Sequence, residues 1–346
     1  MKAKFIKHSL QFKTPGGTSR GVLKIKNTWF LILEHQGKRG YGECGMFEGL
    51  SYDDVPQFEE KLQWVCEHIH LGEKQLLAQL SEFPALFFGV EMAFASLRSK
   101  TGFELFPSAF TQKEQGITIN GLIWMGDKNY MKKQITDKLN QGFHCIKLKI
   151  GAIDFQEELR LLKYIRSEFT ASDVELRVDA NGAFSPTEAL EKLKRLSDYE
   201  LHSIEQPIEA KQIEDMALLC ATTPLPIALD EELIGVTQRP EKEELLKTIQ
   251  PQYIILKPTL VGGFAGSREW IEIAEEQNIK WWITSALESN IGLNAIAQFT
   301  FQLNNEMPQG LGTGSLFTNN IASPLYVKKD QLFYNPSQSW DLTLIS

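Results

Sequence analysis

The chain has 346 residues, which is too long for one small domain and fits either one large barrel or two ordinary domains. Its composition is 42% hydrophobic and 23% charged, the usual balance of a globular protein that buries a sizeable core. The net charge of −8 argues against a nucleic-acid-binding surface, because such a surface needs a basic face. We therefore expect a globular protein with no nucleic-acid partner.

The sequence offers no membrane or export signal. No apolar run approaches the roughly 20 residues that cross a bilayer. Residues 1–13 alternate basic and apolar side chains, so they lack the hydrophobic centre of a signal peptide. The cysteines are far apart and form no C-x-x-C pair, which favours cytosolic thiols over disulfides or a zinc site: Cys44, Cys66, Cys145 and Cys220. The expected location is the cytoplasm, with no membrane partner.

Residues 1–115 read as a separate α+β unit. Apolar and β-branched runs predict strands over 4–12, 21–35 and 39–44. Helices are predicted over 52–70, 73–79 and 84–100. In the last of these, Phe88, Met92 and Ala95 recur at helical spacing, and Gly102 follows as a stop signal.

From residue 116 onward strands and helices alternate. Short β-branched runs begin near residues 117, 145, 175, 203, 227, 253 and 281, and a helical segment follows each. From residue 145 onward these starts are 24 to 30 residues apart, the period of a βα unit, and such units in series predict a parallel barrel. A doubly wound sheet is the alternative, disfavoured because no Gly-rich dinucleotide turn follows an early strand. The tail after residue 318 lacks another full unit and is expected to return to the first domain.

Two lysines lie on one predicted barrel strand, in the run from Cys145 to Ile150. Side chains alternate along a strand, so Lys147 and Lys149 share one face, opposite the apolar side chains. Taken alone, this run would more often be an exposed, half-polar strand. In a barrel the lysines would instead point inward, where burial lowers a lysine pKa and suits a general base.

Three carboxylates end three consecutive predicted strands: Asp179, Glu205 and Asp230. Each alone is more often a helix N-cap. Together at the carboxyl mouth of a barrel they would repel one another unless a cation lay between them, and oxygen ligands favour Mg²⁺ or Mn²⁺. Lys257, at the end of the next strand, would lie across the mouth from Lys147 and Lys149, although a structural ion pair with Asp230 is its alternative role.

This combination suits removal of a proton next to a carboxylate. The enediolate that forms carries extra negative charge, which a divalent cation stabilises while a positioned lysine takes the proton. The expected partner is therefore a small-molecule carboxylate substrate.

Six short motifs together resemble the muconate-lactonising subgroup of the enolase superfamily. They are Lys147-x-Lys149, Asp179-Ala180-Asn181-Gly182, Glu205-Gln206-Pro207, Leu229-Asp230-Glu231, Lys257-Pro258 and, near the start, Tyr41-Gly42-Glu43-Cys44, which is similar to a G-x-G-E element. The resemblance extends over nearly the whole chain. It implies an α/β fold with an N-terminal α+β capping domain (1–115, completed by 318–346) over a (β/α)7β TIM-like barrel (116–317).

Within the subgroup the motifs are most similar to those of the o-succinylbenzoate synthases of menaquinone biosynthesis, which dehydrate a succinyl-hydroxycyclohexadiene-carboxylate. The resemblance implies that Lys149 abstracts the α-proton and that Lys257 stabilises the enediolate. It implies that Lys147 supports the substrate carboxylate. Further substrate contacts are expected at Asn181, Ser285, Gly312 and Arg20.

Several rival functions stay open. Dipeptide epimerases of the subgroup carry an Asp-x-Asp on the eighth strand, whereas residues 312–315 here are Gly-Thr-Gly-Ser. Muconate cycloisomerases and N-acylamino acid racemases use the same lysines, while mandelate-type chemistry would need a histidine near the seventh strand. Glu232 stands where relatives often have serine. Outside this chemistry, Lys149 could be the nucleophile of a Schiff-base aldolase, or the barrel could be purely structural. The sequence leaves the oligomeric state undetermined.

Overall fold

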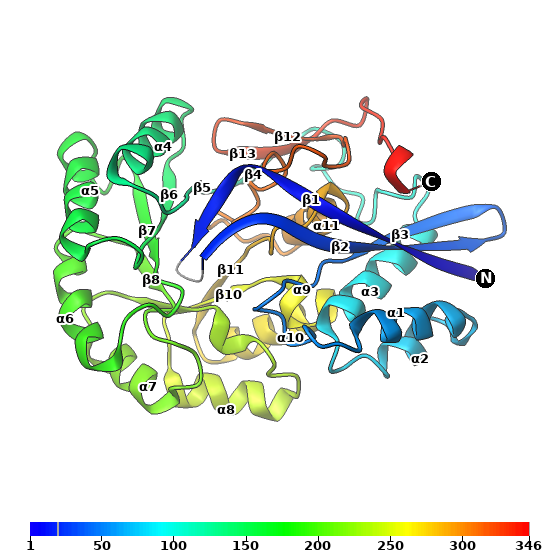
Figure 1. Cartoon of the computed structure of the whole chain (residues 1–346), viewed down its shortest axis with the longest axis horizontal. Helices are drawn as coiled ribbons and strands as arrows, with labels where there is room; N and C mark the ends of the chain where they lie inside the picture. The colour runs from blue at the N-terminus through cyan, green and yellow to red at the C-terminus, as the bar shows by residue number, and fades with distance from the viewer. Residues whose placement is uncertain (19–20, 346) are drawn as a thin grey trace.

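The computed structural model describes residues 1–18 and 21–345. The capping helices, within residues 58–98, lie on the right of the view and the barrel helices within residues 128–249 form an arc on the left, while the first two capping strands run across the middle (Figure 1). In the described part of the chain, no helix is both long and apolar enough to span a bilayer.

The capping sheet is antiparallel, in the order β1 (Lys2–Thr18), β2 (Gly21–His35), β3 (Lys38–Cys44). Helix α3 (Pro84–Arg98) packs closely on it, and this approach requires glycine: a Cβ on Gly42 would lie 2.0 Å from the carbonyl oxygen of Gly89. The remaining helical elements of this region are α1 (Phe58–Glu67), η1 (Ile69–Leu71) and α2 (Glu73–Leu77).

The helix predicted over 52–70 was too long at its start. Residues 52–57 form turns instead of helix. Asp53 is fully buried there and accepts a hydrogen bond from the Ala85 amide at 2.8 Å, which ties the segment to the start of α3. This long-range contact overrides the local helical pattern.

Seven parallel strands form the barrel sheet, in the order β5 to β11. They are β5 (Gly121–Ile123), β6 (Cys145–Lys149), β7 (Glu175–Asp179), β8 (Ser203–Glu205), β9 (Ile227–Leu229), β10 (Tyr253–Leu256) and β11 (Lys280–Ile283). Gln309 and Gly310 make parallel bridges to Ile119 and Thr284, so they stand between the two sheet edges where an eighth strand would lie. The predicted α/β barrel with an N-terminal cap is confirmed.

Helices follow the strands and cover the barrel. They are α4 (Lys128–Asn140), α5 (Phe155–Glu168), α6 (Pro186–Ser197), α7 (Ile213–Thr222), η2 (Glu231–Leu233), α8 (Arg239–Ile249), α9 (Pro258–Val261), α10 (Gly263–Glu276) and α11 (Asn290–Gln302). The largest hydrophobic core cluster joins the apolar side chains of these helices to those of the barrel strands, such as Ile146, Leu148 and Val178.

The first barrel strand was predicted at the wrong place. The run at 117 forms β4 (Ile117–Thr118), which pairs antiparallel with β13 (Gln331–Tyr334) of the tail, and β13 pairs with β12 (Leu325–Lys328). The barrel strand itself begins at Gly121. The run at 117, which is richer in β-branched residues than the barrel strand, therefore pairs with a strand more than 200 residues away along the chain.

The tail contacts both parts of the molecule. The Thr318 amide donates to the Gln11 carbonyl at 2.8 Å, and Trp340 stacks on Phe103 with 4.3 Å between ring centroids. The β12–β13 hairpin instead joins β4 beside the barrel. The domain boundaries given above, at 115/116 and 317/318, stay predictions.

Candidate active site

Both lysines of β6 lie inside the barrel. The side chains of Lys147 and Lys149 are 8% and 11% exposed, while Ile146 and Leu148 pack into the core between strands and helices. The alternative of an exposed, half-polar strand is therefore wrong.

The three carboxylates lie on neighbouring strands beside these lysines. Asp179 is paired in register with Glu205, and Asp230 follows β9 directly. All three are buried, with at most 2% of each residue exposed. The close spacing of parallel strands thus gathers these two lysines and three carboxylates at the carboxyl end of the barrel.

Ammonium groups face each carboxylate. The Nζ atoms of Lys147 and Lys149 lie 2.8 Å and 2.6 Å from Asp179 Oδ2. Lys147 also contacts Glu205, and Lys257 contacts Asp230. The ion pair considered for Lys257 as an alternative is therefore present, and it brings Lys257 into the same cluster.

The pKa values of the carboxyl groups diverge within the cluster. Burial alone would raise the pKa of Asp179, but Lys147 and Lys149 outweigh burial and hold it well below its usual range. Burial and then the neighbouring Asp179 carboxylate raise the pKa of Glu205 well above its usual value. Glu205 is therefore the carboxylate least compensated by positive charge.

The pKa values of the lysines differ in direction from the expectation. Burial lowers the pKa of Lys147, as predicted, but the facing carboxylates outweigh burial and raise it, and the same balance raises the pKa of Lys257. Where as many carboxylates as lysines face one another, burial does not by itself leave a lysine amine unprotonated at neutral pH.

The donor set suits a hard divalent cation. All three candidate ligands offer carboxylate oxygens, and Glu205 Oε1 is buried without a hydrogen-bond partner among the described residues. Across residues 1–18 and 21–345, no group of three or more His, Cys, Asp or Glu side chains is arranged around one point to hold a metal. Lys147 and Lys257 contact the carboxylate oxygens in that space, so a cation there would have to displace ammonium groups.

A ring of polar residues supports the cluster from the loops after the strands. Asn181 accepts a hydrogen bond from Lys149 Nζ at 2.8 Å and donates to Glu231 at 3.0 Å. Gln206 accepts from the amides of Asp230 and Glu232, both at 3.2 Å, and donates to the Glu232 carboxylate at 3.1 Å. Glu232, the departure from the family pattern, therefore orients Gln206 instead of facing the cluster.

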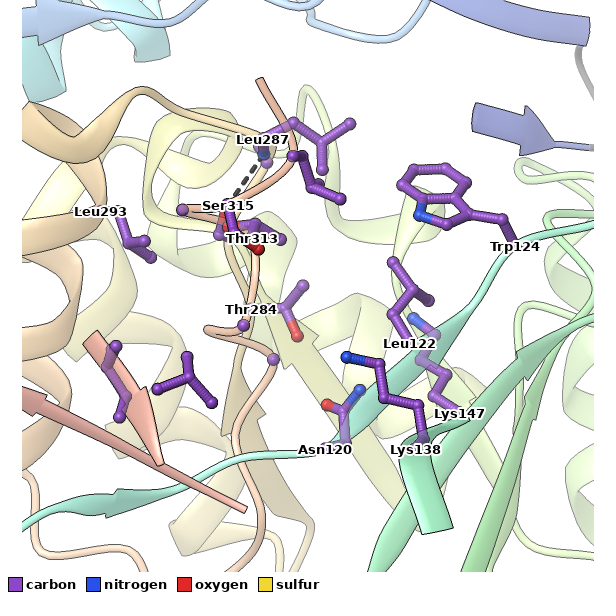
Figure 2. Close-up of a pocket in the computed structure, with 18 of the residues that line it drawn as sticks. Asn120, Leu122, Trp124, Lys138, Lys147, Thr284, Leu287, Leu293, Thr313 and Ser315 are labelled. Carbon is purple, nitrogen blue, oxygen red and sulfur yellow. Dashed lines mark hydrogen bonds between the residues drawn. The ribbon is translucent and has the colours of Figure 1, made fainter. Parts of the chain in front are cut away.

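A cavity of about 790 Å³ opens onto the cluster, and Lys147, Lys149 and Lys257 all line it. In Figure 2, Leu122, Trp124 and Lys147 line one side, with Leu287, Thr313 and Ser315 opposite. The capping region contributes Phe47 and Leu50. A volume in this range is typical of small-molecule sites.

The predicted substrate contacts divide into three groups. Ser285 and Gly312 line the cavity, and Ser285 Oγ lies 2.8 Å from Thr313 Oγ1. Asn181 lies behind Lys149 and contacts that lysine. Arg20 lies outside the described residues.

Sequence reasoning missed the wall formed by Leu122 and Trp124. These residues belong to, or follow, the barrel strand that was placed too early. The apolar Leu-Ile-Trp run at 122–124 was the available signal.

Comparison with known proteins agrees with this geometry. The family described as "Enolase C-terminal domain-like" matches residues 130–332. An o-succinylbenzoate synthase from Desulfotalea psychrophila is 48% identical, and the match covers 94% of this chain and 97% of that protein. The chain belongs to the o-succinylbenzoate synthase family of the enolase superfamily.

Solved structures of the superfamily share the fold. The structure of MenC from Desulfotalea psychrophila matches with a TM-score of 0.86 at 44% identity, covering 96% of this chain and 99% of that one. A muconate lactonizing enzyme from Pseudomonas fluorescens matches with a TM-score of 0.84 at 21% identity, covering 98% of this chain and 96% of that one. The second likeness concerns the fold alone.

Proposed function

We propose that this enolase superfamily member is an o-succinylbenzoate synthase, a hydro-lyase. It would dehydrate 2-succinyl-6-hydroxy-2,4-cyclohexadiene-1-carboxylate to 2-succinylbenzoate in menaquinone biosynthesis. The observation that carries the proposal is the juxtaposition of Lys149 and Lys257 on one cavity beside three buried carboxylates. The 48% identity to a relative with that activity supports the same substrate.

The chain's own residues account for the proton transfers. Lys149 takes the α-proton, which breaks a C–H bond, and returns it to the hydroxyl group as the ring C–O bond breaks, so that water leaves and the ring becomes aromatic. Asn181 accepts a hydrogen bond from Lys149 and orients its amine. Lys257 holds a positive charge near the carboxylate as negative charge develops on it.

Metal binding forms part of the proposal. Asp179, Glu205 and Asp230 would hold Mg²⁺, with Mn²⁺ as the alternative. The cation would supply positive charge for the substrate carboxylate and would remove the repulsion that raises the pKa of Glu205. Lys147, freed from Glu205, would then be available to support the substrate carboxylate.

Other reactions of the superfamily are second candidates. Lys149 and Lys257 line the same cavity, an arrangement that also suits two-base racemisation of N-acylamino acids, and muconate cycloisomerisation uses the same lysines. Dipeptide epimerisation is less well supported, because the cavity wall at 312–315 offers glycine and hydroxyl groups and no carboxylate. A small-molecule carboxylate is the substrate in every case. We place the protein in the cytoplasm because its scattered cysteines favour cytosolic thiols, and we expect no nucleic-acid partner because its net charge is −8.

Parallel assays with purified protein and Mg²⁺ test the proposal. The cyclohexadiene substrate, N-acylamino acids, muconate and dipeptides would be supplied at equal concentrations, and kcat/KM would be measured for each. We expect dehydration to be preferred. A preference for any of the other substrates would contradict the proposal.

A further inference from the structure

The capping sheet contains a buried lysine that the proposed reaction does not use. Lys26 lies on β2 and is 5% exposed, and its Nζ donates to the Gly45 carbonyl at 3.0 Å. Burial lowers the pKa of Lys26, and the carboxylates of Glu43 and Glu288 act against this lowering. A lysine is costly to bury unless negative charge faces it, so these two carboxylates are its counter-charges.

Glu43 reaches from β3 to the start of α11 in the barrel. Its carboxylate accepts hydrogen bonds from the Ser289 amide at 2.8 Å, the Ser289 hydroxyl at 2.5 Å and the Gly292 amide at 2.8 Å. The Thr28 hydroxyl donates to it from within the capping sheet at 2.8 Å. Glu43 therefore fixes the N-terminus of α11, which a negative charge also favours electrostatically.

Glu288 links the same place to the active site. Its carboxylate accepts from the Ala286 amide at 3.1 Å and from the hydroxyl of Thr259, which follows Lys257 by two residues. Its second oxygen, Oε2, is buried without a hydrogen-bond partner among the described residues. A Cβ on Gly45 would lie 3.3 Å from Lys26 Nζ, 3.5 Å from Glu288 Cγ and 3.5 Å from Thr259 Cγ2. Lys26, Glu288 and Thr259 thus all pack around Gly45, whose carbonyl accepts the hydrogen bond from the Lys26 ammonium group.

The segment held by these carboxylates forms a wall of the cavity. Ser285, Ala286 and Leu287 line it, and the Leu287 amide donates to Ser285 Oγ at 3.0 Å. Leu287 has a φ of 63°, in the left-handed region that a leucine rarely adopts. Such a conformation persists only where surrounding contacts impose it. Here Glu288 accepts a hydrogen bond from the Ala286 amide, and Glu43 accepts one from the Ser289 amide.

We infer that Lys26 is a positioning residue, which from the capping sheet balances the Glu43–Glu288 pair and so holds the wall at 285–289 and Thr259 in place beside Lys257. Without this ammonium group, the two buried carboxylates would repel each other with no positive charge from the capping sheet to offset the repulsion. A carboxylate displaced by that repulsion would lose some of the hydrogen bonds that shape the wall. The inference uses the proposed dehydration only as one of its assays.

Three variants test the inference. Lys26→Met removes the charge and keeps an unbranched side chain. Lys26→Met/Glu288→Gln removes one positive and one negative charge together, while glutamine keeps an oxygen that can accept from Thr259 and Ala286. Lys24→Met is the matched control, because Lys24 is an exposed lysine two residues away on the same strand.

The first readout is kcat/KM for the cyclohexadiene substrate at pH 8. We expect Lys26→Met to lower kcat/KM about tenfold or more at pH 8, which corresponds to about 1.4 kcal/mol. The double variant should recover most of the activity, and Lys24→Met should match the wild type. A Lys26→Met enzyme with the wild-type rate, or a double variant no better than the single one, would overturn the inference.

The second readout does not depend on turnover. Hydrogen–deuterium exchange at the Ser289 and Gly292 amides should accelerate in Lys26→Met and return toward the wild-type rate in the double variant. If the wild type turns over none of the cyclohexadiene substrate, the proposed function fails, and the exchange rates still decide on Lys26. If Lys26→Met does not fold while the double variant does, charge balance is supported. If neither folds, Lys26 acts by packing and the inference is wrong.

Discussion

Replacing Lys147 by methionine should destabilise the metal-free protein far more than the metal-loaded one. Lys147 Nζ lies 2.8 Å from Asp179 Oδ2 and also contacts Glu205, and all three side chains are at most 8% exposed. After the change, Asp179 keeps Lys149, but Glu205 loses the ammonium group that contacts it. Removing one partner of a buried ion pair costs about 3–5 kcal/mol, because the other charge stays buried and unpaired.

A bound divalent cation should offset most of this loss. The variant's carboxylates have one fewer ammonium group to displace, so they should bind Mg²⁺ more tightly than those of the wild type. At one Mg²⁺ concentration well above both Kd values, a variant that binds Mg²⁺ a hundredfold more tightly than the wild type would gain about 2.7 kcal/mol more in its free energy of unfolding. The free energy of unfolding of the Lys147→Met variant should therefore lie much closer to the wild-type value in saturating Mg²⁺ than in EDTA.

Urea unfolding at pH 7.5, in EDTA and in Mg²⁺, measures both values. Lys133→Met is the control: Lys133 is an exposed lysine paired with Asp137, so its loss should not change stability measurably in either buffer. If Lys147→Met lowers the free energy of unfolding equally in both buffers, the reasoning is refuted, because Lys147 and the metal would then not compete for the same carboxylates.

Three further predictions concern the bound metal, Lys257 and the capping loop at Phe47, and a fourth concerns the pH dependence of the free energy of unfolding. EDTA should abolish turnover and Mg²⁺ or Mn²⁺ should restore it; full activity in metal-free protein would contradict the assigned ligands. Lys257→Arg, which keeps the charge but is a poor proton shuttle, should retain measurable dehydration and lose any racemase activity in a coupled assay of both. Phe47→Ala, in the capping loop at the cavity, should change the ratio of kcat/KM values between substrates more than it changes the Kd for Mg²⁺. Burial raises the pKa of Asp53 and of Glu91 to about 7, so the folded state binds protons that the unfolded state has lost, and the free energy of unfolding should fall as pH rises from 5 to 8. Urea titrations in which stability rises over that range would contradict those shifts.

Strand periodicity was sufficient to place the main charged residues. Alternation along the run at 145–150 put Lys147 and Lys149 on one face, and the regular βα spacing put Asp179, Glu205 and Asp230 at one end of the barrel. These positions depend on local pattern and on the geometry common to parallel sheets.

Contacts between distant segments were beyond prediction. The run at 117 pairs with residues 331 and 332 of the tail, so the barrel begins at Gly121 instead. Glu43 contacts Ser289, 246 residues away, and nothing local at either residue indicates the other. The direction of the lysine pKa shifts was also missed, because it depends on how closely carboxylates approach each ammonium group and not on burial alone.

The most direct test of the account is the chemistry of Lys149. The Lys149→Ala variant would be incubated with the cyclohexadiene substrate and Mg²⁺ in deuterated water, and both dehydration and exchange of the α-proton would be followed. If Lys149 serves first as base and then as acid, the Lys149→Ala variant should lose essentially all dehydration together with exchange of the α-proton. A Lys149→Ala protein that still dehydrates the substrate at close to the wild-type rate would contradict the assignment of Lys149 as the base.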